Sequence, residues 1–126
     1  MTLLARLLAG LVALFFLVWG LRCYFTPDAM AIEFGVAASG VAGLSTMRGD
    51  LGGAFVGIGA LIAFGLRSGA SRWLYGPAGI IGAVMLGRIV GFAADGLVPN
   101  SVVAFAVEAV FVAVLLGAAR ALGRVR

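Results

Sequence analysis

Long apolar stretches separated by short polar segments dominate this chain. A helix needs roughly 20 residues to cross about 30 Å of hydrocarbon, and each stretch is that long or nearly so. The pattern therefore predicts an all-α fold, an integral membrane four-helix bundle that forms a single domain over residues 1–126. The predicted spans run approximately over residues 3–21, 51–66, 73–94 and 102–119.

The outer loop segment, residues 22–50, is too long to be a structureless connection in so small a protein. Thr26, Pro27 and Asp28 form a typical helix start, with a capping residue, a proline in the first turn and an early acid. They predict a short helix over residues 27–34. This helix either lies in the outer interface or forms a lid over a site.

Arg88 and Glu108 are charged residues well inside the last two apolar stretches. The two stretches are joined by a short connection, residues 96–101, so they form an antiparallel hairpin. Both side chains then lie at a similar depth, and we expect the cation and the anion to meet. Charge inside a membrane is costly and marks a candidate functional site.

Other charged residues are expected near the same end of the bundle. Asp95 follows Arg88 by seven residues, about 700° of helical rotation, so the two share a face. The second span begins at the same surface. We therefore predict a nearly neutral cluster in the outer half of the bundle, made of Arg48, Asp50, Arg88, Asp95 and Glu108. It is a salt bridge that fixes helix register, a polar ligand site, or a proton or ion relay.

Glycine is abundant, with 20 residues, and its spacing is helical. Small residues along one helix face allow helix backbones to approach closely in lipid. Such a face serves packing within the bundle or, alternatively, a homodimer. The predicted packing positions are Gly53 and Gly57 on the second span and Gly79, Gly87 and Gly91 on the third.

The composition supports a membrane protein, and the charge distribution orients it. The chain is 63% hydrophobic and 11% charged, far more apolar than a small soluble domain. The net charge of +4 does not indicate nucleic-acid binding, because the arginines are scattered over short segments. Arg22 and Arg48 fall on one side of four alternating spans, and the larger group predicts cytoplasmic N and C termini. That group comprises Arg6, Arg67, Arg72, Arg120, Arg124 and Arg126.

Residue types for most site chemistry are missing from the sequence. There is no histidine and a single cysteine, Cys23, so we expect no metal site and no cofactor. No catalytic residues are assigned. Asp50 and Glu108 are carboxylates of the kind used in acid–base reactions, which leaves an enzymatic role open.

Three short motifs give the chain a family resemblance. They are the run from Arg48 to Gly53, the segment from Gly87-Arg88 through Gly91 to Asp95-Gly96, and Glu108. With these motifs the chain resembles a family of small bacterial four-helix membrane proteins of unknown function, distantly similar to the DoxX and DoxD group. The chain departs from the family pattern at Asp50-Leu51, where an aromatic residue is usual.

The resemblance implies a four-helix bundle and marks a set of positions, but it implies no reaction. By analogy, DoxX-type relatives imply a link to quinone or thiol redox partners. The marked positions are Arg48, Gly52, Gly53, Gly87, Arg88, Asp95, Gly96 and Glu108.

The first hypothesis for function is a protein of the bacterial inner membrane that binds a lipid or a quinone-like, isoprenoid-like ligand at the polar cluster. The alternative is an accessory subunit that stabilises a larger membrane complex, or a homo-oligomer, through the glycine face. A third is a proton-coupled carrier that uses Glu108. Membrane lipids are partners in each case, and nucleic acid is not.

Overall fold

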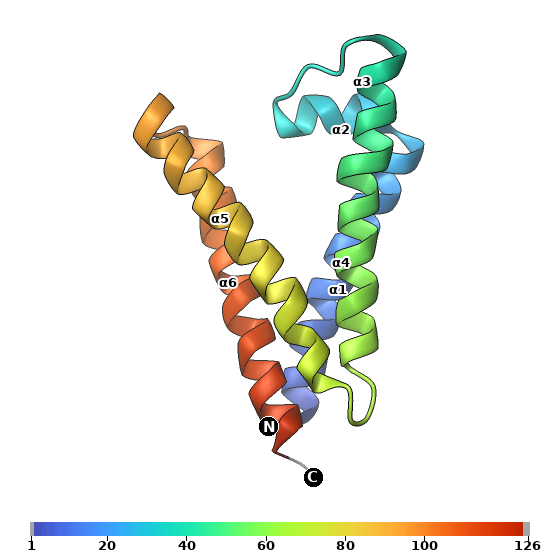
Figure 1. Ribbon diagram of the computed structural model, residues 1–126, viewed down its shortest axis with the longest axis vertical. Helices are drawn as coiled ribbons and strands as arrows, with labels where there is room; N and C mark the ends of the chain where they lie inside the picture. Colours follow the sequence, from blue (N-terminus) through green and yellow to red (C-terminus); the bar gives the residue numbers. More distant parts are fainter. Residues whose placement is uncertain (1, 125–126) are drawn as a thin grey trace.

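The computed structural model describes residues 2–124, so Arg126 and its predicted cytoplasmic position lie outside the described residues. These residues form helices and no strand, which confirms the all-α fold class (Figure 1). A π-helical turn, η1, and a 3-10 turn, η2, extend two of the helices. The elements are α1 Thr2–Phe25, α2 Pro27–Phe34, α3 Gly40–Thr46, η1 Met47–Gly52, α4 Gly53–Gly65, η2 Ser71–Leu74, α5 Tyr75–Asp95 and α6 Pro99–Gly123.

Four helical stretches are long and apolar enough to cross a membrane, which indicates a multi-pass membrane protein. They are Thr2–Phe25, Gly40–Gly65, Ser71–Asp95 and Pro99–Gly123.

The second span begins at Gly40, not near residue 51 as the sequence predicts. Its first part, α3, is built from small residues without a strong apolar pattern, and the π-helical turn continues it directly into α4. Arg48 and Asp50 therefore lie within the helix and not in a loop before it.

The predicted short helix is present as α2, with Pro27 in its first turn. Gly35 ends the helix at φ 68°, a left-handed conformation that glycine adopts without steric cost, and its N–H donates to the Ile32 carbonyl at 3.0 Å. Thr26 does not cap the helix with its side chain. Its hydroxyl donates instead to the Arg22 carbonyl at 2.9 Å, at the end of α1.

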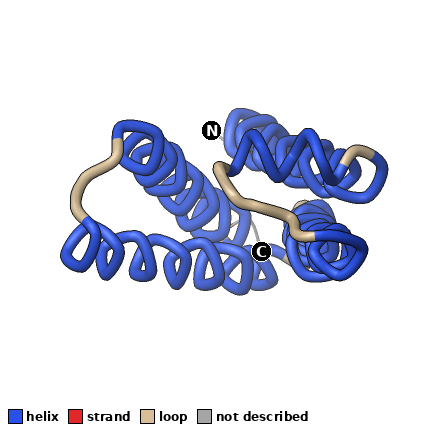
Figure 2. The backbone as a smooth tube through the Cα atoms, turned by 90° about the horizontal axis from the view of Figure 1, so that it is seen from above, coloured by secondary structure: helices blue, strands red, loops and turns tan. Residues whose placement is uncertain are grey.

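The helices form two arms that meet at one end of the molecule and diverge toward the other (Figure 1). One arm is the α1–α4 pair, and the second is the α5–α6 hairpin. Figure 2, viewed from above, shows the two pairs on opposite sides of the molecule. Both termini and the α4–η2 connection lie at the closed end. The main core is there, with Ala9, Ile62, Leu74, Leu115 and Ala118 almost fully buried.

Glycines bring α1 and α4 into backbone contact. A Cβ atom at Gly20 would lie 2.7 Å from Val56 Cγ2 and 2.8 Å from the Val56 backbone nitrogen. A Cβ atom at Gly59 would lie 2.7 Å from Leu17 Cγ. Such separations are too short for real atoms, so only glycine permits this approach.

The glycines that the sequence predicts for helix packing are not the ones at which α1 and α4 approach each other. A Cβ atom at Gly53 would come no closer than 3.9 Å to another group, the Tyr24 hydroxyl. At the other four positions nothing lies within 4 Å of the Cβ site. Close packing in this chain therefore uses a different glycine set. The four positions with open space are Gly57, Gly79, Gly87 and Gly91.

Candidate functional site

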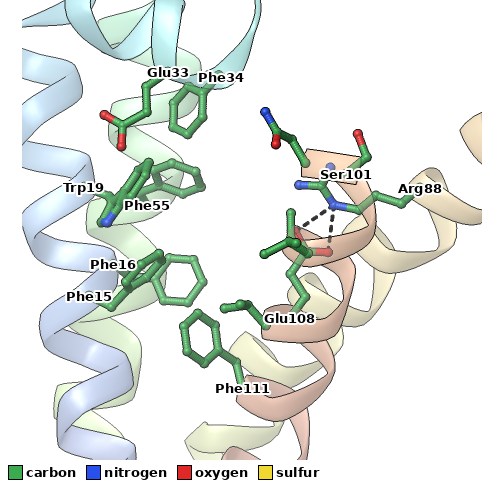
Figure 3. A pocket seen from close by; sticks show the side chains of 14 residues that line it. Phe15, Phe16, Trp19, Glu33, Phe34, Phe55, Arg88, Ser101, Glu108 and Phe111 are labelled. Atoms are coloured by element: carbon green, nitrogen blue, oxygen red, sulfur yellow. Dashed lines mark hydrogen bonds and ion pairs between the residues drawn. The ribbon is translucent and has the colours of Figure 1, made fainter. Parts of the chain in front are cut away.

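A cleft of about 480 Å³ lies between the two arms, below α2 (Figure 3). Residues of α1, α2 and α4 line one side, and residues of α5 and α6 line the other. The two sides differ in chemistry, since the first is mostly aromatic and the second carries polar groups. The lining residues are Phe15, Phe16, Trp19, Glu33, Phe34, Phe55, Arg88, Asn100, Ser101, Val103, Ala104, Val107, Glu108 and Phe111.

The aromatic wall is a continuous set of ring contacts. Phe15 stacks on Trp19 at a centroid distance of 5.2 Å, and Trp19 contacts Phe34 of α2 at 5.5 Å. Phe34 in turn meets Phe55 of α4 edge-on at 5.8 Å. Each ring fixes the next at a distance typical of favourable aromatic pairs. Three helices thus present one apolar surface to the cleft.

Phe111 of α6 closes the floor of the cleft. Its ring lies 5.0 Å from Phe15 and 5.7 Å from Phe16, measured between centroids. It is the point in this region where the second arm meets the aromatic wall (Figure 3). Below Phe111 the arms merge into the main core, and above it they separate.

Arg88 and Glu108 form the polar wall. The Arg88 Nε atom donates to both carboxylate oxygens of Glu108, each at 2.9 Å. The side chains are 31% and 15% exposed, so the pair is half-buried. The α5–α6 connection sets this alignment, and Gly96, at φ 92°, provides its turn. The predicted meeting of these two charges is thus found in the structure.

The terminal nitrogens of Arg88 are not used by this pair. Within residues 2–124 neither Nη atom has a hydrogen-bond partner. The guanidinium points into the cleft, toward the side of the aromatic wall (Figure 3). A guanidinium carries five N–H donors, so four remain for an acceptor in the cleft.

A second ion pair lies at the top of the aromatic wall. Arg22 at the end of α1 donates through Nη2 to Glu33 Oε2 of α2 at 2.6 Å. The Arg22 guanidinium also lies 5.3 Å from the centre of the Trp19 ring, a cation–π geometry. These contacts hold α2 over the aromatic wall, with Glu33 above Trp19 (Figure 3).

The other three charges of the predicted cluster do not join Arg88 and Glu108. Arg48 donates from Nε to the Tyr24 carbonyl at 3.0 Å, on the α1–α4 arm. Asp50, in the same π-helical turn, and Asp95, at the end of α5, have no hydrogen-bond or ion-pair partner among the described residues. None of the three lines the cleft. The arms diverge at this end, which separates Arg48 and Asp50 from Arg88. Asp95 shares α5 with Arg88 but lies seven residues further on, about 10 Å along the helix axis.

Comparison of the chain with protein-family models, with curated proteins and with solved structures gives no match. The resemblance to DoxX-like proteins therefore stays a prediction.

Sequence reasoning missed the aromatic wall and Glu33. In an apolar span, a phenylalanine that lines a cleft and one that faces lipid contribute to the hydropathy pattern in the same way. Trp19 fits an interfacial anchor equally well. The i, i+4 spacing of Phe15 and Trp19 was a usable indication of a shared face. Glu33 lies in the last turn of α2 and Arg22 in the last turn of α1, so their ion pair depends on how α2 folds back over α1.

The cleft is suited to binding. It offers N–H donors on one wall, aromatic faces on the other, and two carboxylates that are each engaged by an arginine. An apolar molecule with a hydrogen-bond acceptor at one end matches this arrangement.

Proposed function

We propose that this chain is a multi-pass protein of the bacterial inner membrane, with cytoplasmic termini, that binds a lipid or quinone-like apolar ligand in the cleft. The polar end of the ligand accepts hydrogen bonds from Arg88. The observation that carries this proposal is the pair of unshared Nη atoms directed into a cleft with an aromatic opposite wall.

The size and lining of the cleft support a ligand of this class. Small-molecule sites occupy about 300 to 1,000 Å³ and combine apolar walls with few polar groups, and the cleft has about 480 Å³. Aromatic faces such as those of Phe15 and Trp19 accommodate a planar ring or an unsaturated chain. A polar head at Arg88 then faces the hydroxyl of Ser101 and the amide of Asn100.

The charge balance favours a head group without excess charge. Glu108 neutralises Arg88, and Arg22 neutralises Glu33, so each wall carries a compensated pair. An uncompensated anion would gain little net attraction there. A carbonyl oxygen, or the phosphoryl oxygen of a zwitterionic lipid, takes the free N–H groups without adding charge.

The divergent arms give the ligand a route from the bilayer. Val103 and Val107 line the cleft and are also well exposed on α6. An apolar molecule in lipid reaches the aromatic wall between the arms without crossing water. Membrane lipids are therefore both the surroundings and the competing occupants of the site.

Native mass spectrometry of gently purified protein, with extraction of bound molecules, tests the proposal. We expect a co-purifying apolar molecule on the wild-type chain and on Asp95→Asn, a control on the same helix outside the cleft. Arg88→Gln removes the Nη donors and should lose it.

A charge exchange separates ligand binding from helix pairing. The double variant Arg88→Glu with Glu108→Arg keeps an ion pair between α5 and α6 but moves the guanidinium. We expect it to fold and to lose the ligand. Retention of the same molecule by the Arg88→Gln variant, with the fold intact, would reject the proposal.

A second candidate function, an accessory subunit of a larger membrane complex, rests on the α5 glycines. Gly79, Gly87 and Gly91 contact nothing within 4 Å of a Cβ position, so they leave a flat face for another helix. A pull-down in mild detergent with Gly87→Leu tests it. A partner that is lost on this substitution supports it, and recovery of an unchanged monomer counts against it.

A further inference from the structure

A second pocket, of about 400 Å³, lies at the closed end of the molecule, where the termini are. The first turns of α1, the last turn of α6 and the α4–η2 connection enclose it. Two arginines, hydroxyl side chains and two leucines make up most of its lining. These residues are Thr2, Leu3, Arg6, Arg67, Ser68, Gly69, Ser71 and Leu122.

Its arginines have no acidic partner among the residues that the structure describes. Both ion pairs among the described residues, Arg22–Glu33 and Arg88–Glu108, lie elsewhere. Arg6 has no polar partner within residues 2–124, and Arg67 lies over the Phe64 ring at 5.6 Å. The pocket therefore presents two uncompensated guanidinium groups beside three hydroxyls.

The α4–η2 connection that holds Arg67 is a defined turn. The Ala70 backbone N–H donates to the Arg67 carbonyl at 3.1 Å, and Gly69 takes the left-handed conformation at φ 76°. Gly123 of α6 lies against Ser71, since a Cβ atom there would be 3.5 Å from the hydroxyl oxygen. The lining is thus fixed by packing of α6 on the turn.

The acidic residues of the chain lie away from the closed end. The five acidic residues all lie in or near the divergent half, in α2, η1, the end of α5 and the outer part of α6. The positive potential at the closed end is therefore not compensated within residues 2–124. A phosphate group takes bidentate hydrogen bonds from guanidinium and accepts from hydroxyls, which matches this lining.

An apolar track leads away from the pocket along α1. Its leucines are exposed at one side of the helix and begin at the pocket itself, where Leu3 is 69% exposed. They recur at helical spacing, so an acyl chain attached to a bound phosphate has a surface to follow. The track consists of Leu3, Leu4, Leu7, Leu8, Leu11 and Leu14.

We propose that this pocket is a binding site for the phosphate group of an anionic lipid, with Arg6 and Arg67 as the ligands of the phosphate. The site is separate from the cleft and does not depend on its function. The lipid rests its chains on the α1 track and its head between α1 and the α4–η2 connection. Basic pockets between membrane helices bind anionic head groups in this way.

The test compares lipids on purified protein in a neutral detergent. Phosphatidylglycerol should raise the thermal midpoint of the wild-type chain more than phosphatidylcholine does at the same concentration, because a zwitterionic lipid can occupy the cleft but not the pocket. Arg6→Gln and Arg67→Gln should each weaken phosphatidylglycerol binding about tenfold or more, as expected for loss of a charge-assisted hydrogen bond. Arg6→Lys and Arg67→Lys keep the charge, so they should bind phosphatidylglycerol more tightly than the glutamine variants and less tightly than the wild type.

Charge-matched controls come from the same end of the molecule. Arg72→Gln and Arg120→Gln remove one exposed arginine each, outside the pocket. We expect binding close to that of the wild type. Equal weakening by all four glutamine variants would show a diffuse charge effect and overturn the site.

Glycerol phosphate tests the source of the phosphate group. At equal phosphate concentration it should produce a smaller thermal shift than phosphatidylglycerol, because it lacks the chains. An equal shift would overturn the assignment to a lipid. Wild-type affinity of the Arg6→Gln and Arg67→Gln variants would overturn the site altogether.

Discussion

The two arms of this molecule are held together by different means. In the α1–α4 arm, glycines at Gly20 and Gly59 allow the helices to touch through their backbones. In the α5–α6 arm, the outer half is joined by the Arg88–Glu108 pair and by an edge-on contact of Phe92 with Phe105 at 5.9 Å.

This difference corresponds to the different chemistry of the two walls of the cleft. The tightly packed arm carries the aromatic wall, whose rings depend on a fixed backbone. The other arm supplies the polar pair, and a Cβ atom added at its α5 glycines would meet nothing within 4 Å among residues 2–124. Geometry on the first wall is set by steric fit, and on the second by an ion pair, one aromatic contact and the turn between α5 and α6. Substitutions on the two arms should therefore differ in the size of their effect.

The largest effect should come from Gly20→Val. The added atoms meet Val56, including its backbone nitrogen, which cannot move without shifting α4. Overpacking costs about 1 to 3 kcal/mol, and a clash with backbone lies at the upper end. Thermal unfolding in detergent measures this loss of stability.

The matched control is Gly57→Ala on α4, where nothing lies within 4 Å. It should be neutral or stabilise by about 0.5 to 1 kcal/mol, the helix propensity gain over glycine. Equal destabilisation by Gly20→Val and Gly57→Ala would contradict the close approach of α1 and α4.

Arg88→Gln should have an intermediate effect on stability. It leaves the Glu108 carboxylate, 15% exposed, without its partner. An unsatisfied buried group costs about 1 to 3 kcal/mol. The double variant Arg88→Gln with Glu108→Gln should recover most of the loss, and a double-mutant cycle on the unfolding free energy checks it. Strictly additive effects would show that the pair does not hold the second arm.

Arg22→Gln should change stability less. Both members of the Arg22–Glu33 pair are about 40% exposed. Such exposed pairs contribute about 0 to 1 kcal/mol. The visible result should instead be a shift of Trp19 fluorescence, because the cation over its ring is removed. An unchanged emission spectrum would argue against that contact.

Gly79→Leu should have the smallest effect on the isolated chain. Its side chain would enter open space on α5, so we expect a change within about 0.5 kcal/mol in thermal unfolding. Marked destabilisation would mean that this face is packed, either on the chain itself or on a second copy.

The sequence was sufficient for the spans and for one contact. Length and hydropathy predict four spans, although not the start of the second at Gly40, and Pro27 places the short helix correctly. Arg88 and Glu108 lie at a similar distance from the short connection between the last two spans, which predicts that their side chains meet, and they do. These features depend on local pattern and on adjacent helices.

The remaining features depend on how the two arms sit relative to each other. Depth along a span does not reveal that the arms diverge, so Arg48 and Asp50 were expected beside Arg88 and are not. Apolar periodicity likewise does not separate Phe55, which lines the cleft, from a lipid-facing phenylalanine. Glycine spacing alone did not distinguish Gly59, whose Cβ position is filled by α1, from Gly57, whose Cβ position is open space among the described residues.

Ligand binding beside Trp19 is the most direct test of the proposed function. The chain has two tryptophans, and Trp73→Phe leaves Trp19 as the sole reporter in the cleft. Titration with a short-tailed benzoquinone and with a bromine-labelled zwitterionic lipid should quench its fluorescence saturably for at least one of them. Adding Arg88→Gln should abolish the saturable part. Quenching that never saturates, or that is the same with and without Arg88, would contradict a ligand site in the cleft.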